Sequence, residues 1–146
     1  MSVTFIEGNK KIELSIVGYE FAAKKGMDEY DSNWLTVAIE YFDGVEHHSY
    51  ADNCLLADEL ESVVREMKDI LSGKETGMIA DFTEPYLGLA VTKVDDIYAV
   101  QIRFVYDTSG EWKEIYVSQG FTEEMYQEVC CEMENTSKQF PTRNNL

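Results

Sequence analysis

Apolar and polar residues alternate with a period of two along most of this chain, and this pattern predicts strands. In KIELSIV, residues 11–17, the apolar Ile12, Leu14 and Ile16 are separated by polar side chains. The same alternation recurs in three later segments: WLTVAIEYF (34–42), LGLAV (87–91) and IYAVQIRFVY (97–106). Alternation places one set of side chains on each face of a strand. We therefore expect half-buried strands whose apolar faces share one core.

Two segments have the spacing of an amphipathic helix instead. In the first, apolar residues recur at intervals of three and four positions: Leu60, Val63, Val64, Met67, Ile70 and Leu71. Asp58 followed by Glu61 resembles a capping box, and Gly73 suits the C-terminal cap. The second helix is expected from about residue 123 to about residue 135, with Thr122 as its N-cap. We expect the tail after about residue 136 to fray.

Short polar turns separate the predicted strands, and short connections favour antiparallel pairs. The dipeptide Asp43-Gly44 is a strong hairpin signal. The order is three or four strands, a helix, about four strands and a second helix. We therefore predict an α+β fold: an antiparallel twisted sheet or sandwich of about seven to eight strands with two helices, one mid-chain and one C-terminal. With 146 residues the chain suits a single domain, 1–146.

The charge of the chain is high for a small domain. Acidic residues number 28 against 12 basic residues, which gives a formal net charge of −16. Such a surface repels phosphate groups, so we expect neither nucleic acid nor an anionic membrane as a partner. A basic protein would instead be attracted and steered towards it. The competing interpretation is an acidic protein without any such partner.

The chain lacks the residue spacings of common catalytic and metal-binding motifs. The three cysteines, Cys54, Cys130 and Cys131, form neither an even disulfide framework nor a CxxC pair. His47 and His48 are neighbours in a predicted strand, so they point to opposite faces. Phosphate-binding glycine loops and nucleophile-elbow motifs are absent. We expect no catalytic residue, no metal and no cofactor.

The N-terminal segment MSVTFIEGNKK lacks the apolar core of a signal peptide. No apolar run in the sequence approaches membrane-spanning length. We therefore expect a cytoplasmic protein, and the sequence pattern predicts no particular oligomeric state.

Two acidic segments are candidate binding surfaces. In the second predicted helix, Glu124, Glu128 and Glu132 lie four residues apart and therefore form one row. Like charges at this spacing destabilise a helix by about 0.2–0.5 kcal/mol per pair, and a basic partner would relieve them. The polar loop before the WLTVAIEYF strand offers an aromatic residue beside two acids: Asp28, Glu29 and Tyr30. For both segments the alternative is an ordinary solvated surface.

Three motifs occur in an order that resembles the WapI-type family of bacterial immunity proteins. YDSNWL is followed by CLLADELESV and then by FTEPYLGLAV. The matching positions are Asp31, Asn33, Trp34 and Leu35; Cys54, Leu55, Leu56, Glu59 and Leu60; and Phe82, Glu84, Pro85 and Leu87. The resemblance extends over roughly residues 5–104, and the acidic C-terminal helix lies outside it.

The resemblance implies a protein that is not an enzyme and that binds and neutralises a cognate toxin domain. Many such toxins are nucleases, and a nuclease must be basic to hold phosphates. The implied partner is therefore a basic toxin domain, which agrees with the acidic charge of this chain. Two other classes stay open: a small acidic adaptor or regulatory domain that binds another protein, and a carboxylate-dependent hydrolase.

The residues of this sequence signature are expected to be architectural. Asp31 and Asn33 have short side chains that bond to nearby backbone and favour tight turns. They would set Trp34 under the first predicted helix, with its indole N–H bonded to a loop carbonyl. Glu84 and Pro85 belong to the same structural signature. The alternative is that the aromatic and acidic members of the YDSNWL segment form a binding hot spot.

Overall fold

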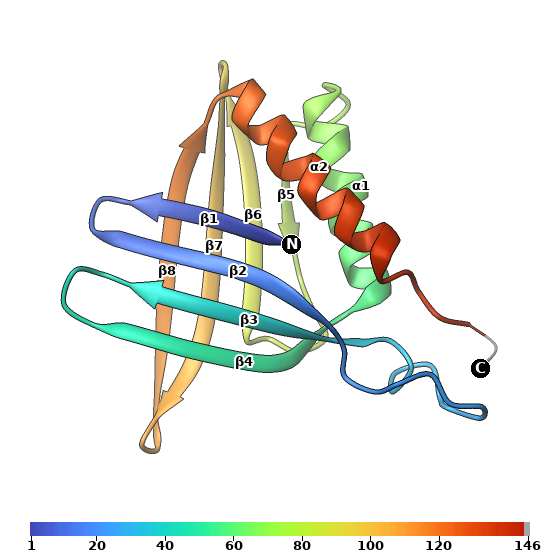
Figure 1. The fold of residues 1–146 in the computed structure, drawn as a ribbon. Helices are drawn as coiled ribbons and strands as arrows, with labels where there is room; N and C mark the ends of the chain where they lie inside the picture. Colours follow the sequence, from blue (N-terminus) through green and yellow to red (C-terminus); the bar gives the residue numbers. More distant parts are fainter. Residues whose placement is uncertain (145–146) are drawn as a thin grey trace.

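The computed structural model describes residues 1–144 and has two four-stranded antiparallel sheets with two helices (Figure 1). The elements follow in the order β1 Ser2–Glu7, β2 Lys10–Tyr19, β3 Trp34–Phe42, β4 His47–Leu56, α1 Ala57–Leu71, β5 Gly77–Ala80, β6 Leu87–Val94, β7 Ile97–Thr108, β8 Glu111–Phe121 and α2 Glu123–Gln139. The predicted α+β fold, with one helix mid-chain and one C-terminal, is confirmed. No helix within the described residues is long and apolar enough to cross a bilayer.

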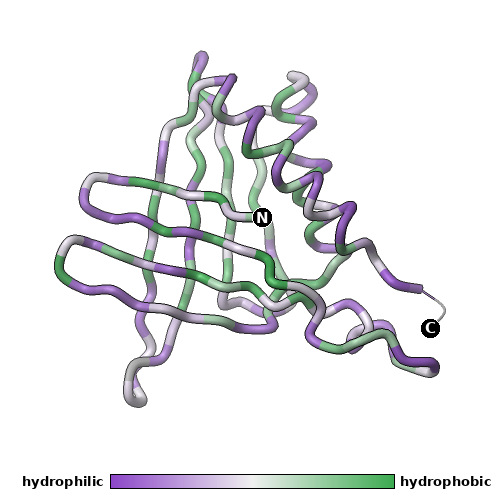
Figure 2. The backbone as a smooth tube through the Cα atoms, in the orientation of Figure 1, coloured by the Kyte–Doolittle hydropathy of each residue, from purple (hydrophilic) through white to green (hydrophobic). Residues whose placement is uncertain are grey.

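Each sheet is a simple meander, β1-β2-β3-β4 in the first and β5-β6-β7-β8 in the second. The strands of the first sheet run across those of the second (Figure 1). Hydrophilic and hydrophobic positions alternate along these strands (Figure 2), so each sheet turns one apolar face inward. The core lies between these faces and includes residues that are at most 2% exposed: Phe5, Ile12, Leu35, Val91, Ile102 and Phe104.

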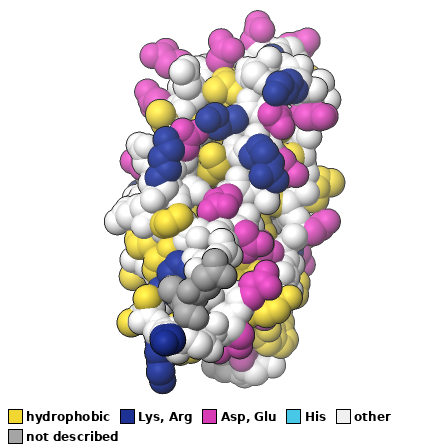
Figure 3. All heavy atoms as spheres, turned by 90° about the vertical axis from the view of Figure 1, so that its right-hand side faces the viewer, with side chains coloured by type: hydrophobic (Ala, Val, Ile, Leu, Met, Phe, Trp, Pro, Cys, Tyr) yellow, Lys and Arg dark blue, Asp and Glu magenta, His cyan; other side chains and the backbone are white. Residues whose placement is uncertain are grey.

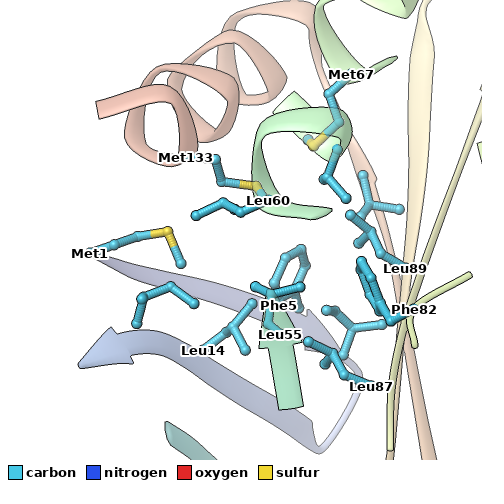
Figure 4. Close-up of a pocket in the computed structure, with 14 residues that line it drawn as sticks. Met1, Phe5, Leu14, Leu55, Leu60, Met67, Phe82, Leu87, Leu89 and Met133 are labelled. Carbon is cyan, nitrogen blue, oxygen red and sulfur yellow. The ribbon is translucent and has the colours of Figure 1, made fainter. Parts of the chain in front are cut away.

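Both helices pack side by side and close one side of this core (Figure 1). A cavity of about 20 Å³ remains beneath them, and its fourteen lining residues are all apolar (Figure 4). They come from both sheets and both helices, as Phe5, Leu87, Leu60 and Met133 illustrate. A cavity of this size holds about one water molecule, which would find no hydrogen-bond partner there. It is therefore part of a packed core and not a ligand pocket.

The start of α1 differs from the sequence-based expectation. After the Asp43-Gly44 hairpin, β4 continues to Leu56 and leads directly into α1. The Glu59 carboxylate accepts a 2.9 Å hydrogen bond from the Leu56 N–H. The capping carboxylate is therefore Glu59 and not Glu61, because the pairing of Leu56 with Trp34 determines where the strand ends and the helix begins.

The end of α2 also differs from the expectation. Thr122 caps the helix as predicted, with its hydroxyl oxygen accepting a 3.3 Å hydrogen bond from the Met125 N–H. The helix continues to Gln139 rather than ending near residue 135. Beyond it, the Thr142 N–H donates a 2.9 Å hydrogen bond to the Glu61 carboxylate of α1. The segment expected to fray is thus helical at first and then bonded to a distant element.

Candidate binding groove

A buried tyrosine holds α2 in one rotational setting. Tyr126 stacks on Tyr98 of β7, with ring centroids 4.2 Å apart. Its hydroxyl donates a 2.9 Å hydrogen bond to the carbonyl oxygen of Met67 in α1. Burial raises the pKa of Tyr126, so the hydroxyl remains a donor at neutral pH. The side of α2 that carries the predicted acidic row therefore faces solvent.

A groove of about 240 Å³ separates α2 from β1 and receives part of this row. Its lining comes from three elements: Ser2, Val3 and Thr4 of β1, Phe121 of β8, and Met125, Glu128, Val129 and Glu132 of α2. The four α2 residues follow the spacing i, i+3, i+4, i+7 and so share one helix face. Glu124 lies one turn before Glu128 in the same row. The structure therefore places two of the three predicted glutamates on the wall of a groove.

One end of the groove is closed where the edges of the two sheets meet. The Ile6 N–H donates a 2.7 Å hydrogen bond to the Gln119 side-chain oxygen. In return, the Ser118 N–H donates a 3.2 Å hydrogen bond to the Glu7 carboxylate. These bonds tie β1 to β8. Towards the N-terminal end of β1, α2 passes close to the strand (Figure 1). The groove is lined there by Ser2, Val3 and Thr4.

The acidic row differs from Glu134 of the same helix, which is paired with two cations. Glu134 pairs with Lys68 at 2.6 Å and with Lys138 at 3.1 Å, and these bonds hold the pKa of its carboxyl below the usual value. The three glutamates of the row make no ion pair with any residue from 1 to 144. On the helix side of the molecule, basic side chains are intermingled with acidic ones (Figure 3). The row is thus a line of exposed carboxylates without an ion pair within residues 1–144.

The second predicted surface lies at the other end of α2. Asp28, Glu29 and Tyr30 belong to the loop between β2 and β3, and all three are exposed. The Asp28 carboxylate accepts a 2.7 Å hydrogen bond from the Asp31 N–H, which also gives it a local structural role. This loop lies near the C-terminal end of α2, whereas the groove lies beside its N-terminal half (Figure 1). The fold therefore keeps the two predicted surfaces apart.

Asn33 is the main architectural residue of the YDSNWL segment. Its side chain is only 1% exposed. The Nδ2 group donates hydrogen bonds to the carbonyl oxygens of Glu29 at 2.8 Å and Arg143 at 3.1 Å. Its Oδ1 accepts a 2.7 Å hydrogen bond from the Arg143 N–H, and its main-chain carbonyl accepts a 2.9 Å bond from the Ala57 N–H. Asn33 thus joins the loop, the C-terminal segment and the start of α1.

Arg143 completes a contact that we call the C-terminal clasp, formed by Tyr19, Ser32, Asn33 and Arg143. The Arg143 Nε donates a 2.6 Å hydrogen bond to the Ser32 carbonyl. Its guanidinium carbon lies 3.7 Å from the centre of the Tyr19 ring, and the Tyr19 hydroxyl donates to the Pro141 carbonyl. Asn33 and Arg143 are 110 residues apart in the chain. The clasp is therefore a tertiary contact that the local sequence pattern does not reveal.

The other signature residues have smaller structural roles. Trp34 is half-buried at the start of β3, and the expected hydrogen bond of its indole N–H is not found within residues 1–144. Asp31 is exposed and contributes through its backbone N–H. The Pro85 carbonyl accepts a 3.0 Å hydrogen bond from the Arg103 guanidinium. Nothing in the structure explains Glu84.

Sequence motifs did not indicate an exposed aromatic cluster on the second sheet. Trp112 of β8 is 60% exposed and stacks on Tyr86, with ring centroids 5.7 Å apart. Tyr116 is 44% exposed and pairs across the strands with Arg103. Trp, Tyr and Arg are the residues that most often dominate binding energy at protein interfaces. One signal was available in the sequence: Trp112, Glu114 and Tyr116 stand at alternate positions, so in a strand they share one face.

The histidines and cysteines do not assemble into a site. His47 contacts Glu40 at 2.7 Å, whereas His48 contacts Glu46 at 3.2 Å. No group of three or more His, Cys, Asp or Glu side chains among the described residues can hold a metal ion. Burial raises the pKa of the Cys54 thiol to about 12, so this thiol stays protonated at neutral pH.

Comparisons with known proteins support the fold and the family signature. The structure of WHY1 from Arabidopsis thaliana is similar at a TM-score of 0.52, with 12% identity over 96% of this chain and 90% of that chain. The plant transcriptional regulator PBF-2 is similar at a TM-score of 0.50, with 12% identity over 96% of this chain and 81% of that chain. These likenesses concern the fold alone. No curated protein sequence matches at a significant level. Residues 3–141 match the model of the Immunity protein WapI-like family.

Proposed function

Because this chain belongs to the WapI-like family of immunity proteins, we propose that it binds and neutralises a cognate toxin domain through an acidic surface. The family match over residues 3–141 is the observation that carries the proposal, because it includes nearly the whole chain. It extends the sequence resemblance to α2, which the three motifs did not reach. In this proposal the protein acts by occupying a surface of the toxin, without a catalytic residue or cofactor of its own.

The charge of the chain supports a basic toxin domain, such as a nuclease, as the partner. A nuclease carries cations that hold phosphates, and an inhibitor with a net charge of −16 presents carboxylates to the same cations. Opposite charges also steer the two proteins together, which raises the association rate. A fast association suits an inhibitor that must capture a toxin in the cytoplasm, where we place this protein.

Calorimetry tests the proposal directly. The purified chain is titrated with the toxin domain encoded by the adjacent gene, at low and at moderate salt. We expect tight binding that weakens as salt rises, because the Debye length shortens from about 30 Å at 0.01 M to about 8 Å at 0.15 M salt. A toxin assay with and without the chain then measures neutralisation. Absence of binding to the toxin domain would leave the adaptor and hydrolase interpretations in its place.

A matched pair of charge-reversal variants distinguishes the two predicted surfaces. Glu128→Lys with Glu132→Lys changes the groove, and Glu29→Lys with Asp31→Lys changes the loop by the same net charge. We expect the groove variant to weaken toxin binding by more than about tenfold and the loop variant by only a few-fold. Equal losses would mean that binding follows net charge alone. A larger loss for the loop variant would assign the interface to the loop.

A further inference from the structure

We propose that the free edge of β1 pairs with an extended, basic segment of the toxin, which adds a strand to the first sheet inside the groove. This inference rests on the proposed function, because it names the site and the mode of the same binding event. Addition of a strand to an exposed sheet edge is a recurring way in which proteins bind extended segments. Three features of the groove support it: unpaired backbone groups on β1, and both apolar side chains and glutamates on the α2 wall.

The unpaired backbone groups follow from the geometry of the strand. β1 pairs with β2 in a continuous antiparallel register from Ser2 to Glu7. In such a strand, the N–H and C=O groups of alternate residues point to the same side. The Ile6 N–H points away from β2, because it donates to Gln119 of β8. The N–H and C=O groups of Thr4 and Ser2 therefore point away from β2 as well, into the groove.

These groups lack the protection that the rest of the edge has. No hydrogen bond joins the main-chain groups of Ser2 or Thr4 to an element other than β2 within residues 1–144. At Ile6, by contrast, the Gln119 side chain occupies the position of a neighbouring strand. Proteins usually cover or block an exposed edge, because unpaired backbone invites another chain. Here one end of the edge is blocked and the other is left open beside α2.

The α2 wall of the groove selects the side chains of the incoming segment. Met125 is 41% exposed and Val129 is half-buried, and both present apolar surface to the groove. Glu128 and Glu132 line the same wall without a cation partner within residues 1–144. An added strand lies about 4.8 Å from β1 and projects alternate side chains to each face. The matching segment therefore combines lysine or arginine with small apolar residues.

Charge complementarity identifies the occupant. A second copy of this chain would bring another net charge of −16 to the acidic wall and would be repelled. A nucleic acid strand carries the same sign and is also repelled. A basic segment neutralises the row of glutamates and pairs with the backbone of β1 at the same time. The toxin domain of the proposed function is the partner with this chemistry.

Substitution of Thr4 tests the strand pairing. Thr4→Pro removes the outward N–H and leaves the β1–β2 hydrogen bonds in place, because proline is tolerated on the free side of an edge strand. Thr4→Val is the matched control, since it keeps the N–H and only replaces the side-chain hydroxyl with a methyl group. In titrations of the full-length chain with the toxin domain, we expect Thr4→Pro to bind at least about tenfold more weakly than Thr4→Val. Equal affinities would overturn the strand addition.

Amide exchange of the wild-type chain gives a second measurement that does not depend on a folded proline variant. The Thr4 N–H has no partner within the described part of the chain and is expected to exchange quickly in the free protein. Strand addition should slow its exchange at least about tenfold when the toxin domain binds. Unchanged exchange at Thr4 in a saturated complex would contradict the inference while leaving the proposed function intact. Failure of the wild-type chain to bind the toxin domain would instead overturn both.

Light scattering of the free chain tests whether a second copy of this chain occupies the groove instead of the toxin. A dimer that Thr4→Pro converts to a monomer would show that a second copy pairs with β1, and this result would overturn the inference. We expect a mass that is the same for the wild type, Thr4→Pro and Thr4→Val.

Discussion

The two ends of α2 differ in how completely their polar groups are paired. At the C-terminal end, the clasp buries Asn33 and joins it to the backbone of Glu29 in its own loop and to the backbone of the distant Arg143. At the N-terminal end, the groove exposes Glu128 and Glu132, which have no cation partner within residues 1–144, beside a strand edge that is open at Thr4. Sequence analysis singled out polar residues in both regions. Those of the clasp are paired within the fold, whereas those of the groove remain available to another molecule.

This difference separates architecture from binding. Buried polar groups stabilise a fold when each has a partner, and they cost stability when a partner is removed. Exposed groups of like charge instead repel one another in the free protein. Binding of an oppositely charged molecule relieves this repulsion. The clasp should therefore be sensitive to mutation in stability measurements, and the groove should be sensitive in binding measurements.

The largest expected loss of stability comes from Asn33→Ala in the clasp. The substitution leaves the Glu29 carbonyl and both main-chain groups of Arg143 without their partner. We expect the free energy of unfolding to fall by about 2–4 kcal/mol, measured by urea denaturation. Tyr30→Ala, three positions earlier in the exposed part of the loop, is the control and should change it by less than about 0.5 kcal/mol. A change as small as that of the control would show that the clasp contributes little to the free energy of unfolding.

A smaller loss is expected from Tyr126→Phe, in the helix that connects the two regions. The change removes the hydrogen bond to the Met67 carbonyl and keeps the ring that stacks on Tyr98. We expect the free energy of unfolding to fall by about 0.5–1.5 kcal/mol. Denaturation and toxin titration on the same sample separate stability from binding. Unchanged stability would mean that packing alone holds the rotation of α2.

The groove should show the opposite behaviour to the clasp. Replacing Glu124, Glu128 and Glu132 together by Gln removes two repulsive pairs and one favourable charge near the N-terminal end of the helix. We expect the free energy of unfolding to change by no more than about 1 kcal/mol, while toxin affinity and its salt dependence both fall. Denaturation and calorimetry at two salt concentrations measure these effects. Unchanged affinity and salt dependence would remove the row from the interface.

The smallest expected effect concerns the ion pairs of Glu134, on the side of α2 away from the groove. Hydrogen bonds from Lys68 and Lys138 lower the pKa of this carboxyl in the folded protein. Its contribution to stability is therefore present above the unfolded pKa of about 4.3 and is lost as pH falls through the folded pKa. We expect the melting temperature of Glu134→Gln to depend less on pH below about pH 5 than that of the wild type. Parallel curves for the two proteins would show that these exposed pairs contribute nothing.

Sequence patterns determined most of the strands and helices of this protein, because these elements depend on residues that are close together in the chain. Alternation located β2, β3, β6 and β7, and the i, i+4 spacing placed Glu124, Glu128 and Glu132 on one face of α2. The family signature was also visible in the amino-acid sequence, because it consists of three motifs in a fixed order. Thr122 was predictable as a cap because a helix N-cap acts within three residues.

Tertiary structure alone decided what those elements face. Asn33 looked like a local turn residue, but its partner Arg143 lies 110 residues away. Glu59 became the helix cap because β4 extends to Leu56, a boundary that strand pairing controls. The groove likewise exists only because β8 diverges from β1 after Gln119 and lets α2 pass beside Thr4. Local propensity acts over a few residues, whereas burial and edge pairing depend on which distant segments the fold brings together.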